Sequence, residues 1–288
     1  MGDLGRSAVV TGVSGGIGIE IATQLVASGW RVFGTVRSAA DADRLRSALG
    51  SAFEPLVVEV RDAAQIEAAV AQVAAILGGD RLGALVNNAG IVSAGPLLLQ
   101  PIEQIEAQIA INLLAPLALI RAFAPFLGTD PARPGPPGRI VNISSIAGKV
   151  SLPMMGGYAI SKHGLEAMSD TLRRELAPFG IPVTTVNSGS IRSNIFRSLK
   201  DAVGAYEHTA YAEAMRRFSA MMTAAQEGAW PPATIARRVV KLLDRAKPPA
   251  RLTVVRGKMR NWYVPRLLPA ERVDRRLQRL FALTSESG

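Results

Sequence analysis

The sequence predicts an α/β fold, with one doubly wound parallel sheet of about seven strands and helices on both of its faces. Two observations predict this fold. Short apolar segments typical of buried strands alternate along the chain with longer segments of helical periodicity. A glycine-rich turn separates the first of these strands from the first helix. The chain has 288 residues, of which 48% are hydrophobic, so it can bury a large core.

The predicted elements begin with a strand over 7–11, the glycine turn, and a helix from Ile19 to Ser28 that Gly29 ends. Further strands are predicted over residues 31–36, 56–60, 82–86, 139–143, 183–187 and 251–255. Further helices are predicted over residues 63–77, 101–126, 157–179, 233–246 and 270–283. A proline- and glycine-rich stretch at 128–138 is predicted to be an exposed connection, because the alternation resumes directly after it.

This organisation predicts a single domain over residues 1–256 and an extension over residues 257–288. Within the domain, residues 190–230 carry methionine and aromatic side chains, which either pack in the core or form a mobile lid over a substrate. The extension contains an amphipathic helix with an apolar stripe among arginines. Three roles stay open for it: docking on the body or a neighbouring subunit, contact with a membrane surface, and binding of another partner.

Composition and charge limit the classes of function that are expected for this chain. The net charge is +10, and from Arg251 onward nine Lys and Arg stand against three Asp and Glu. No nucleic-acid-binding motif accompanies this charge, so nucleic acid is not an expected partner. Without cysteine, and with His163 and His208 far apart in the sequence, no metal site is expected. Neither a signal peptide nor a membrane-spanning stretch is expected, which predicts a cytoplasmic protein with membrane contact only through residues 257–288.

The turn Gly12–Gly18 predicts a phosphate-binding site. Between a strand and a helix, glycines allow a tight turn and let backbone N–H groups approach a pyrophosphate at the positive end of the helix. The second strand ends at Thr35 and Val36 without a carboxylate, and Arg37 follows. A carboxylate there would repel a 2′-phosphate, whereas Arg37 can pair with one. The sequence therefore favours NADP(H) over NAD(H), although Arg37 is also compatible with a solvated loop arginine.

Tyr158 and Lys162 lie four residues apart in a predicted helix, on one face. A cation at that spacing favours the phenolate and lowers the pKa of the tyrosine, which suits a group that moves a proton on or off an oxygen. A solvated helix face gives the same pattern. Asn112 lies in an apolar run and needs hydrogen-bond partners. It is either a core amide bonded within its helix or part of a kinked turn that feeds a water chain.

The ordered motifs resemble those of the short-chain dehydrogenase/reductase family, in its branch that acts on hydroxysteroids, retinoids and other lipophilic alcohols or ketones. The motifs are Thr11-Gly12-x-x-x-Gly16-Ile17-Gly18, Asn87-Asn88-Ala89-Gly90, Asn112, Ser144-Ser145, Tyr158-x-x-x-Lys162 and the Ser188-Gly189 turn. The resemblance covers roughly residues 5–256 and implies a Rossmann-type domain. It also implies a homodimer or homotetramer paired through the helices that carry Asn112 and Tyr158.

The resemblance implies a role for each matching residue. Tyr158 is the general acid or base, and Lys162 bonds the nicotinamide ribose and lowers the Tyr158 pKa. Ser145, thirteen residues before Tyr158, bonds the substrate oxygen, and Asn112 holds a water that links Lys162 to solvent. The implied cofactor-binding residues are Gly12, Ser14, Gly16, Ile17, Gly18, Arg37, Glu59, Val60, Asn87, Ala89, Gly90, Tyr158, Lys162, Ser188, Gly189, Ile191 and Ser193.

Three positions depart from the family pattern. Glu59 stands where the family usually has Asp near the adenine, and it keeps the acceptor for the adenine amino group. Ser188 replaces the proline of a Pro-Gly turn and loses its fixed φ, which loosens the loop over the nicotinamide amide. Ser193 replaces a threonine and keeps the hydroxyl.

The expected function is an NADP(H)-dependent oxidoreductase that transfers a hydride between the nicotinamide and the carbonyl or alcohol carbon of a lipophilic substrate. Two alternatives stay open. One is an NAD-dependent alcohol dehydrogenase, and the other is a dinucleotide-binding sensor or scaffold without catalysis. The apolar character of residues 192–230 and of Met154-Met155 indicates a greasy substrate, but neither its identity nor the direction of the reaction.

Overall fold

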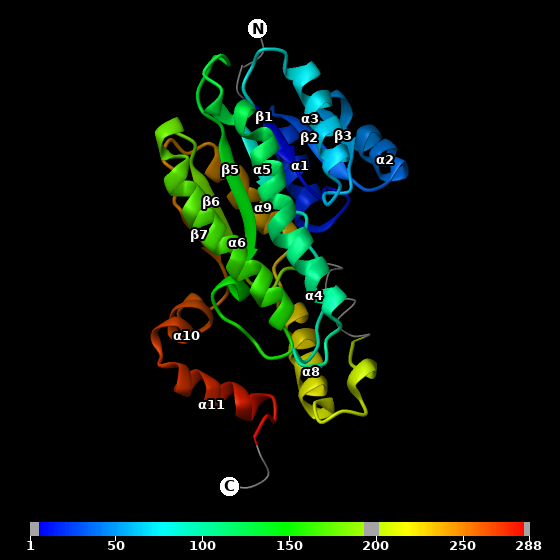
Figure 1. The fold of residues 1–288 in the computed structure, drawn as a ribbon, viewed down its shortest axis with the longest axis vertical. Helices are drawn as coiled ribbons and strands as arrows, with labels where there is room; N and C mark the ends of the chain where they lie inside the picture. Colours follow the sequence, from blue (N-terminus) through cyan, green and yellow to red (C-terminus); the bar gives the residue numbers. More distant parts are fainter. Residues whose placement is uncertain (1–5, 193–201, 285–288) are drawn as a thin grey trace.

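The computed structural model describes residues 6–192 and 202–284. Its centre is a seven-stranded sheet in the order β3-β2-β1-β4-β5-β6-β7, in which every neighbouring pair is parallel. The strands are β1 (Ser7–Val10), β2 (Arg31–Val36), β3 (Phe53–Val57), β4 (Ala84–Asn87), β5 (Arg139–Ser145), β6 (Val183–Ser188) and β7 (Arg251–Val254). The order reverses between β1 and β4, so the predicted doubly wound fold is confirmed (Figure 1).

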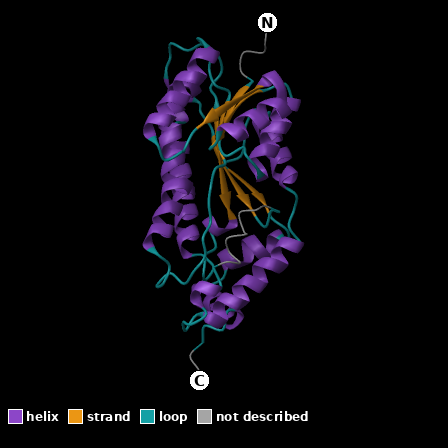
Figure 2. Ribbon diagram, turned by 90° about the vertical axis from the view of Figure 1, so that its right-hand side faces the viewer, coloured by secondary structure: helices purple, strands orange, loops and turns teal. Residues whose placement is uncertain are grey.

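Helices cover both faces of the sheet, which lies between them in Figure 2. Apolar residues of α1 (Gly16–Ala27), α2 (Ala39–Leu49) and α9 (Pro232–Leu243) form one core with the sheet. Residues of α3 (Ala63–Leu77), α5 (Ala115–Ala124) and α6 (Gly156–Glu175) form a second core on the opposite face. The strands between them are buried on both sides, which explains their continuous apolar runs.

The predicted and observed elements differ most around β3. The structure places this strand at Phe53–Val57 instead of residues 56–60, and it adds α2, which the sequence did not predict. Strand β3 lies at the edge of the sheet, where Pro55 is tolerated and Val57 is exposed, so its sequence lacks a central strand's apolar run. Helix α2 buries only Ala42 and Leu45, which leaves a weak periodic signal.

The predicted helix 101–126 is interrupted at its centre. It consists of α4 (Ile102–Ile109), a π-helical turn at Ala110–Leu114, α5, and a second π-helical turn at Pro125–Thr129. The stretch Ile102–Thr129 is long and apolar enough to cross a membrane, so the sequence-based expectation that no such stretch exists was wrong. Leu119, Ile120 and Phe123 are buried in the core against the sheet, which accounts for the apolar composition of this helix.

The C-terminal extension folds back onto the rest of the chain. It contains a π-helical turn at Met259–Tyr263, α10 (Val264–Leu267) and α11 (Ala270–Leu280). Phe281 follows α11 and is 0% exposed, with its ring centre 6.5 Å from that of Phe218 on α8 (Ala212–Glu227). Arg217 of α8 also donates to the Arg279 carbonyl over 3.3 Å. Of the three roles left open for the extension, docking on the body is therefore observed.

Candidate active site

A large cavity opens where the strands end. Its volume is about 1640 Å³, and its walls come from the glycine turn, the ends of β2, β4, β5 and β6, and the starts of α1 and α6. Helix α8 and the C-terminal extension line the opposite side, so the extension forms a roof over this cavity. This is the edge of an open α/β sheet at which cofactors and substrates bind.

The glycine turn has a shape that only glycine allows at two positions. Gly12 has a φ of +70°, and a side chain there would meet the backbone of Ala89. A side chain at Gly18 would collide with the carbonyl oxygen of Gly12, so the turn and α1 pack without any space between them. Thr35 on β2 fixes the turn by accepting a 2.9 Å hydrogen bond from the Gly12 amide.

The start of α1 fits an anionic group. Gly15 caps the helix without any side-chain hydrogen bond, and the first turn carries no acidic residue. The N–H groups of this turn can therefore donate hydrogen bonds to a ligand at the positive end of the helix. Gly15, Gly16 and Ile17 all line the cavity, so the cradle that the turn forms fits the pyrophosphate of a nicotinamide dinucleotide.

The adenosine end of the cavity carries positive charge beside Ser14. Arg37 lines this end, and Arg44 of α2 donates to the Ser14 carbonyl over 3.2 Å. The Glu59 carboxylate is held by Arg61, at 3.1 Å, and this pairing keeps the pKa of Glu59 below its usual range. A 2′-phosphate at this end would meet Arg37 and would face no free carboxylate from Glu59. Arg44 is a neighbour of Ser14 that the sequence did not identify.

Tyr158 lies on the first turn of α6 and lines the cavity beside Ser145, which ends β5. Burial raises the pKa of Tyr158 to about 12, and hydrogen bonding with Ser145 opposes that rise. The Ser145 hydroxyl also accepts from the Ala147 amide over 3.1 Å, which fixes the start of the following turn. The two hydroxyls therefore meet on one wall of the cavity, as the resemblance to the family implies.

Lys162 lies one helical turn after Tyr158 and is also buried. Its ammonium donates to the Ile143 carbonyl over 2.9 Å and stands 5.8 Å from the centre of the Tyr158 ring. Burial lowers the pKa of Lys162 to about 8, although the Glu166 carboxylate opposes this change. The net shift of the Tyr158 pKa is upward and not downward as expected, because burial is its largest cause, while the stabilisation of the phenolate by Lys162 stays a prediction.

Asn112 lies in the π-helical turn and is completely buried. Its side chain donates to the Ile91 carbonyl and to the Ser161 hydroxyl, at 2.9 and 3.0 Å, and accepts from the Ile91 amide. A methyl group at Gly90 would stand 3.1 Å from the Asn112 oxygen and 3.8 Å from the Lys162 nitrogen, which places the amide close to Lys162. Asn112 therefore lies in a π-helical turn and bonds outside its own helix, while the water that it is expected to hold stays a prediction.

The sequence did not predict a cluster of charged and polar side chains around the buried Glu166, behind the site. The Asn187 amide donates to the Ser145 carbonyl over 3.1 Å and to the Glu166 carboxylate over 2.6 Å. Glu166 in turn accepts from Arg251 on β7 over 2.8 Å and lies 3.8 Å from Lys149. The cluster therefore ties α6 to β6 and β7, and through Asn187 it holds the strand end that carries Ser145.

Most of the predicted cofactor-binding residues line the cavity. They are Gly12, Ser14, Gly16, Ile17, Arg37, Glu59, Val60, Ala89, Gly90, Tyr158, Lys162, Ser188, Gly189 and Ile191. Gly18 packs behind the turn, and Asn87 donates to Asn142 over 2.8 Å inside the sheet, so neither lines the cavity. The neighbouring Asn88 does line it and donates to the Thr11 carbonyl over 2.9 Å. Ser193 lies outside the described residues.

The sequence did not indicate that the extension forms a roof over the cavity. From the extension, the cavity is lined by Arg256, Arg260, Asn261, Val264, Pro265, Leu268, Val273, Arg276, Leu277 and Leu280. The apolar stripe of Val273, Leu277 and Leu280 was visible in the sequence as a helix face that needs a partner. Nothing in that pattern indicated that the partner is the wall of the active site.

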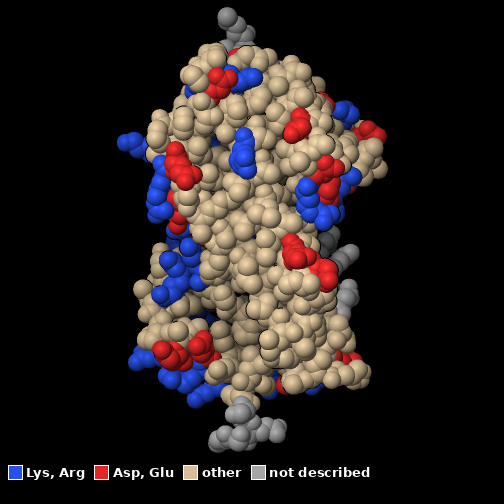
Figure 3. All heavy atoms as spheres, viewed as in Figure 1, with Lys and Arg blue, Asp and Glu red and all other residues tan. Residues whose placement is uncertain are grey.

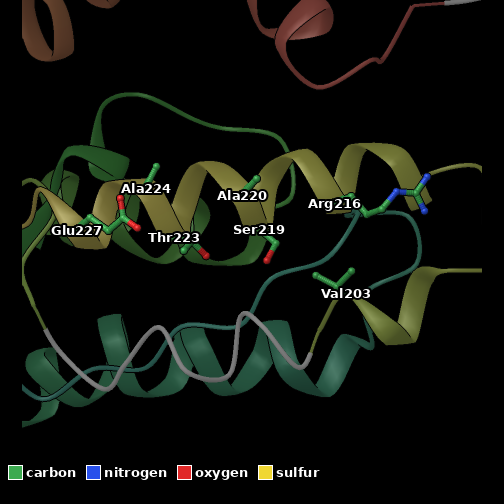
Figure 4. Close-up of a pocket in the computed structure, with 7 residues that line it drawn as sticks. All are labelled: Val203, Arg216, Ser219, Ala220, Thr223, Ala224 and Glu227. Carbon is green, nitrogen blue, oxygen red and sulfur yellow. The ribbon is translucent and has the colours of Figure 1, made fainter.

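A second hollow, of about 500 Å³, lies along α8 and faces Val203 (Figure 4). It is lined by Val203, Arg216, Ser219, Ala220, Thr223, Ala224 and Glu227. None of the predicted catalytic or cofactor-binding residues that the structure describes lines this hollow, and Arg216 is paired with Glu213 at 3.0 Å. We therefore place the candidate active site in the larger cavity.

Comparisons with known proteins agree with this site. The short chain dehydrogenase family matches residues 6–204. NADPH-dependent 3-dehydrocapnine reductase of Ornithobacterium rhinotracheale is 33% identical over 287 residues, which is 98% of this chain and all of that protein. Retinol dehydrogenase 16 of Rattus norvegicus is 37% identical over 187 residues, or 65% of this chain and 57% of that protein.

Among solved structures, a short-chain dehydrogenase from Streptomyces avermitilis covers the whole of both chains, with a TM-score of 0.75 and 26% identity. The match to the family extends over more than half of the chain and includes the glycine turn, the serine of β5 and the Tyr158–Lys162 pair. This chain therefore belongs to the short-chain dehydrogenase/reductase family.

Proposed function

We propose that this oxidoreductase uses NADP(H) to reduce the carbonyl group of a lipophilic substrate, with Tyr158 as the proton donor. The observation that carries this proposal is the burial of Tyr158 beside Ser145 in the wall of a cavity that also holds the glycine turn. With its raised pKa, the phenol keeps its proton at neutral pH, which is the protonation state from which a proton donor in reduction starts.

The roles of the side chains follow from their positions. When bound, the nicotinamide supplies the hydride, and negative charge then develops on the substrate oxygen. Ser145 donates a hydrogen bond to that oxygen, and Tyr158 transfers its proton to it. Lys162, which lies behind Tyr158, would stabilise the phenolate that this transfer leaves, and its ammonium would help to hold the ribose of the bound cofactor.

The nature of the substrate is inferred from the other end of the cavity. Leu152, Met155, Met221 and Met222 line it beside Tyr158, and Leu277 completes an apolar wall from the roof. Such a wall favours an alkyl chain or another extended apolar group. The relative that matches over its whole length is called a reductase of 3-dehydrocapnine and NADPH-dependent, so 3-dehydrocapnine is the first substrate to test.

The test measures oxidation of NADPH and of NADH by the purified protein with a panel of aliphatic ketones that includes 3-dehydrocapnine. We expect turnover with NADPH to exceed that with NADH by about tenfold or more, because Arg37 adds a charge-assisted contact to the 2′-phosphate. We expect Tyr158→Phe to lower kcat by about 10²- to 10⁴-fold, since general acid catalysis contributes about that much.

The matched control is Tyr263→Phe, which removes the hydroxyl of a tyrosine on the surface of the extension. Binding of NADPH to Tyr158→Phe, measured by fluorescence, and its melting temperature should stay close to those of the unchanged protein. Full turnover by Tyr158→Phe would contradict the assignment of the proton donor. Tight NADPH binding without reduction of any ketone would favour the non-catalytic sensor instead.

A further inference from the structure

An arginine interrupts the apolar stripe of α11 that faces the cavity. The residues of α11 that line it are Val273, Arg276, Leu277 and Leu280, at alternating spacings of three, one and three residues. This spacing puts all four on one face of the helix. The neighbouring Arg272 and Arg275 do not line the cavity, so Arg276 differs from them in facing inward.

A second arginine of the roof has the same arrangement. Before and within α10 the cavity is lined by Arg260, Asn261, Val264, Pro265 and Leu268, which again fall on one helical face. Both Arg260 and Arg276 are exposed, so they stand where the cavity opens and their charges are not buried. Figure 3 shows basic side chains over the side of the molecule that carries the extension.

Neither arginine is neutralised within the described part of the chain. Ion pairs there occupy Arg44, Arg46, Arg61, Arg133, Arg173, Arg216, Arg217 and Arg251, but not Arg260 or Arg276. The described carboxylates that line the cavity are Glu20 on α1 and Glu59 after β3, at the cofactor end. The mouth of the apolar region is therefore positive, with arginine donors that suit an oxyanion.

We propose that the substrate is an amphiphile with an anionic head group, a sulfonate, phosphate or carboxylate, which Arg260 and Arg276 bind at the mouth of the cavity. Its apolar chain lies against Leu277, Met221 and Met222, and its carbonyl reaches Tyr158. An arginine fork matches the oxygens of such a head group, whereas a neutral sterol-like or retinoid-like molecule leaves both cations without a partner. This inference rests on the proposed function and adds the charge of the substrate to it.

Binding is tested first, with the NADPH-loaded protein and probes that differ only in their head group. Calorimetry with decanesulfonate, decyl phosphate and decanoate, each below its micelle concentration, is compared with decanol and decyltrimethylammonium. We expect one or more of the anions to bind about 10- to 100-fold more tightly than decanol, because charge-assisted hydrogen bonds contribute that much. The cation should bind more weakly than decanol, and the ranking of the three anions identifies the head group.

The double variant Arg260→Gln with Arg276→Gln should remove that preference and leave binding of decanol unchanged. Its matched control is Arg272→Gln with Arg275→Gln, which removes the same charge from the outward side of α11. Steady-state reduction of a ketone with an anionic head and of its neutral counterpart gives a second measurement. In the double variant the ratio of their kcat/KM values should fall by about 10- to 100-fold, through KM.

Equal binding of anions and decanol by the unchanged protein would overturn the inference, as would an unchanged preference in the double variant. An NADPH affinity that falls in the double variant would also overturn it, since the arginines would then bind the cofactor. These results are distinct from failure of the proposed function. If neutral ketones are reduced without any head-group preference, the function stands and the inference falls, whereas no reduction of any ketone contradicts the function itself.

Discussion

At the scale of single residues, burial sets the pKa values of the two groups in the proposed proton-transfer site. The same desolvation raises the pKa of the Tyr158 phenol to about 12 and lowers that of the Lys162 ammonium to about 8. Both shifts favour the neutral form of each side chain. A spacing of four residues predicts that they are neighbours, but it carries no information about how much water surrounds them. The spacing therefore predicted that the two side chains are neighbours, while the upward shift of the Tyr158 pKa comes from burial, which the spacing does not show.

These two values predict the pH dependence of the reduction. Lys162 carries its charge below about pH 8 and loses it above that value, while Tyr158 keeps its proton up to about pH 12. We therefore expect kcat/KM for ketone reduction to be high below the Lys162 pKa and to fall as the pH rises through it. A pH profile of kcat/KM measures this, and a profile that stays flat across the Lys162 pKa would contradict the role of the ammonium.

Loss of the Glu166 side chain is expected to affect both the stability of the protein and its candidate active site. Its side chain is 1% exposed and accepts hydrogen bonds from Asn187 and Arg251. Glu166→Ala leaves Asn187 without this acceptor and the Arg251 charge partly unpaired, so we expect a loss of about 3 kcal/mol in the free energy of unfolding. Urea denaturation measures the loss, and Glu175→Ala at the exposed end of the same helix is the control. Equal losses in both variants would show that the buried interactions of Glu166 contribute no more to the free energy of unfolding than an exposed glutamate does.

At the scale of elements, the sequence predicted the strands and helices whose two-sided or one-sided burial leaves a clear pattern. Strand β2 and helix α3 have the predicted bounds, because the first is buried in the sheet interior and the second is amphipathic and capped by Asp62. The π-helical turn at Asn112 was expected only as one of two alternatives, since its backbone pattern has no signature in residue type. The roof was not predicted, because its partner is distant in sequence.

The glycine turn gives a prediction about the β1–α1 unit. In Gly18→Ala the new methyl group collides with the Gly12 carbonyl, which belongs to the backbone and cannot rotate away. We expect NADPH affinity to fall by at least about tenfold, because the turn must shift out of its phosphate-binding shape. Fluorescence titration with NADPH measures the change. Gly79→Ala, where a methyl group meets nothing within 4 Å, should bind NADPH normally, and normal binding by Gly18→Ala would refute this account of the turn.

At the scale of the whole molecule, two exposed apolar side chains suggest how two copies associate. Leu114 of the π-helical turn is 53% exposed and Ile160 of α6 is 46% exposed, on the two helices that carry Asn112 and Tyr158. Exposed apolar side chains that gather on one face mark an interaction surface. The predicted homodimer or homotetramer would cover them, so association would rest on the same helices that build the catalytic site.

This arrangement predicts that Leu114→Glu combined with Ile160→Glu lowers the molar mass in solution, because the new carboxylates cannot be buried in an apolar interface. Size-exclusion chromatography with light scattering measures the mass. Leu98→Glu, at a leucine that is 84% exposed in the loop before α4, is the control and should keep the mass of the unchanged protein. A monomeric unchanged protein would remove the premise of the prediction.

The burial of Phe281 also has a practical consequence for anyone who modifies this protein. Because Phe281 is fully enclosed and α11 lines the cavity of the candidate active site, the last described turn of the chain is part of the folded body and lies next to the wall of that cavity. Strand β1 lies towards the opposite end of the molecule from α11 (Figure 1). Affinity tags, fluorescent fusions and surface tethers therefore belong before β1, where their bulk stays away from the cavity that α11 lines.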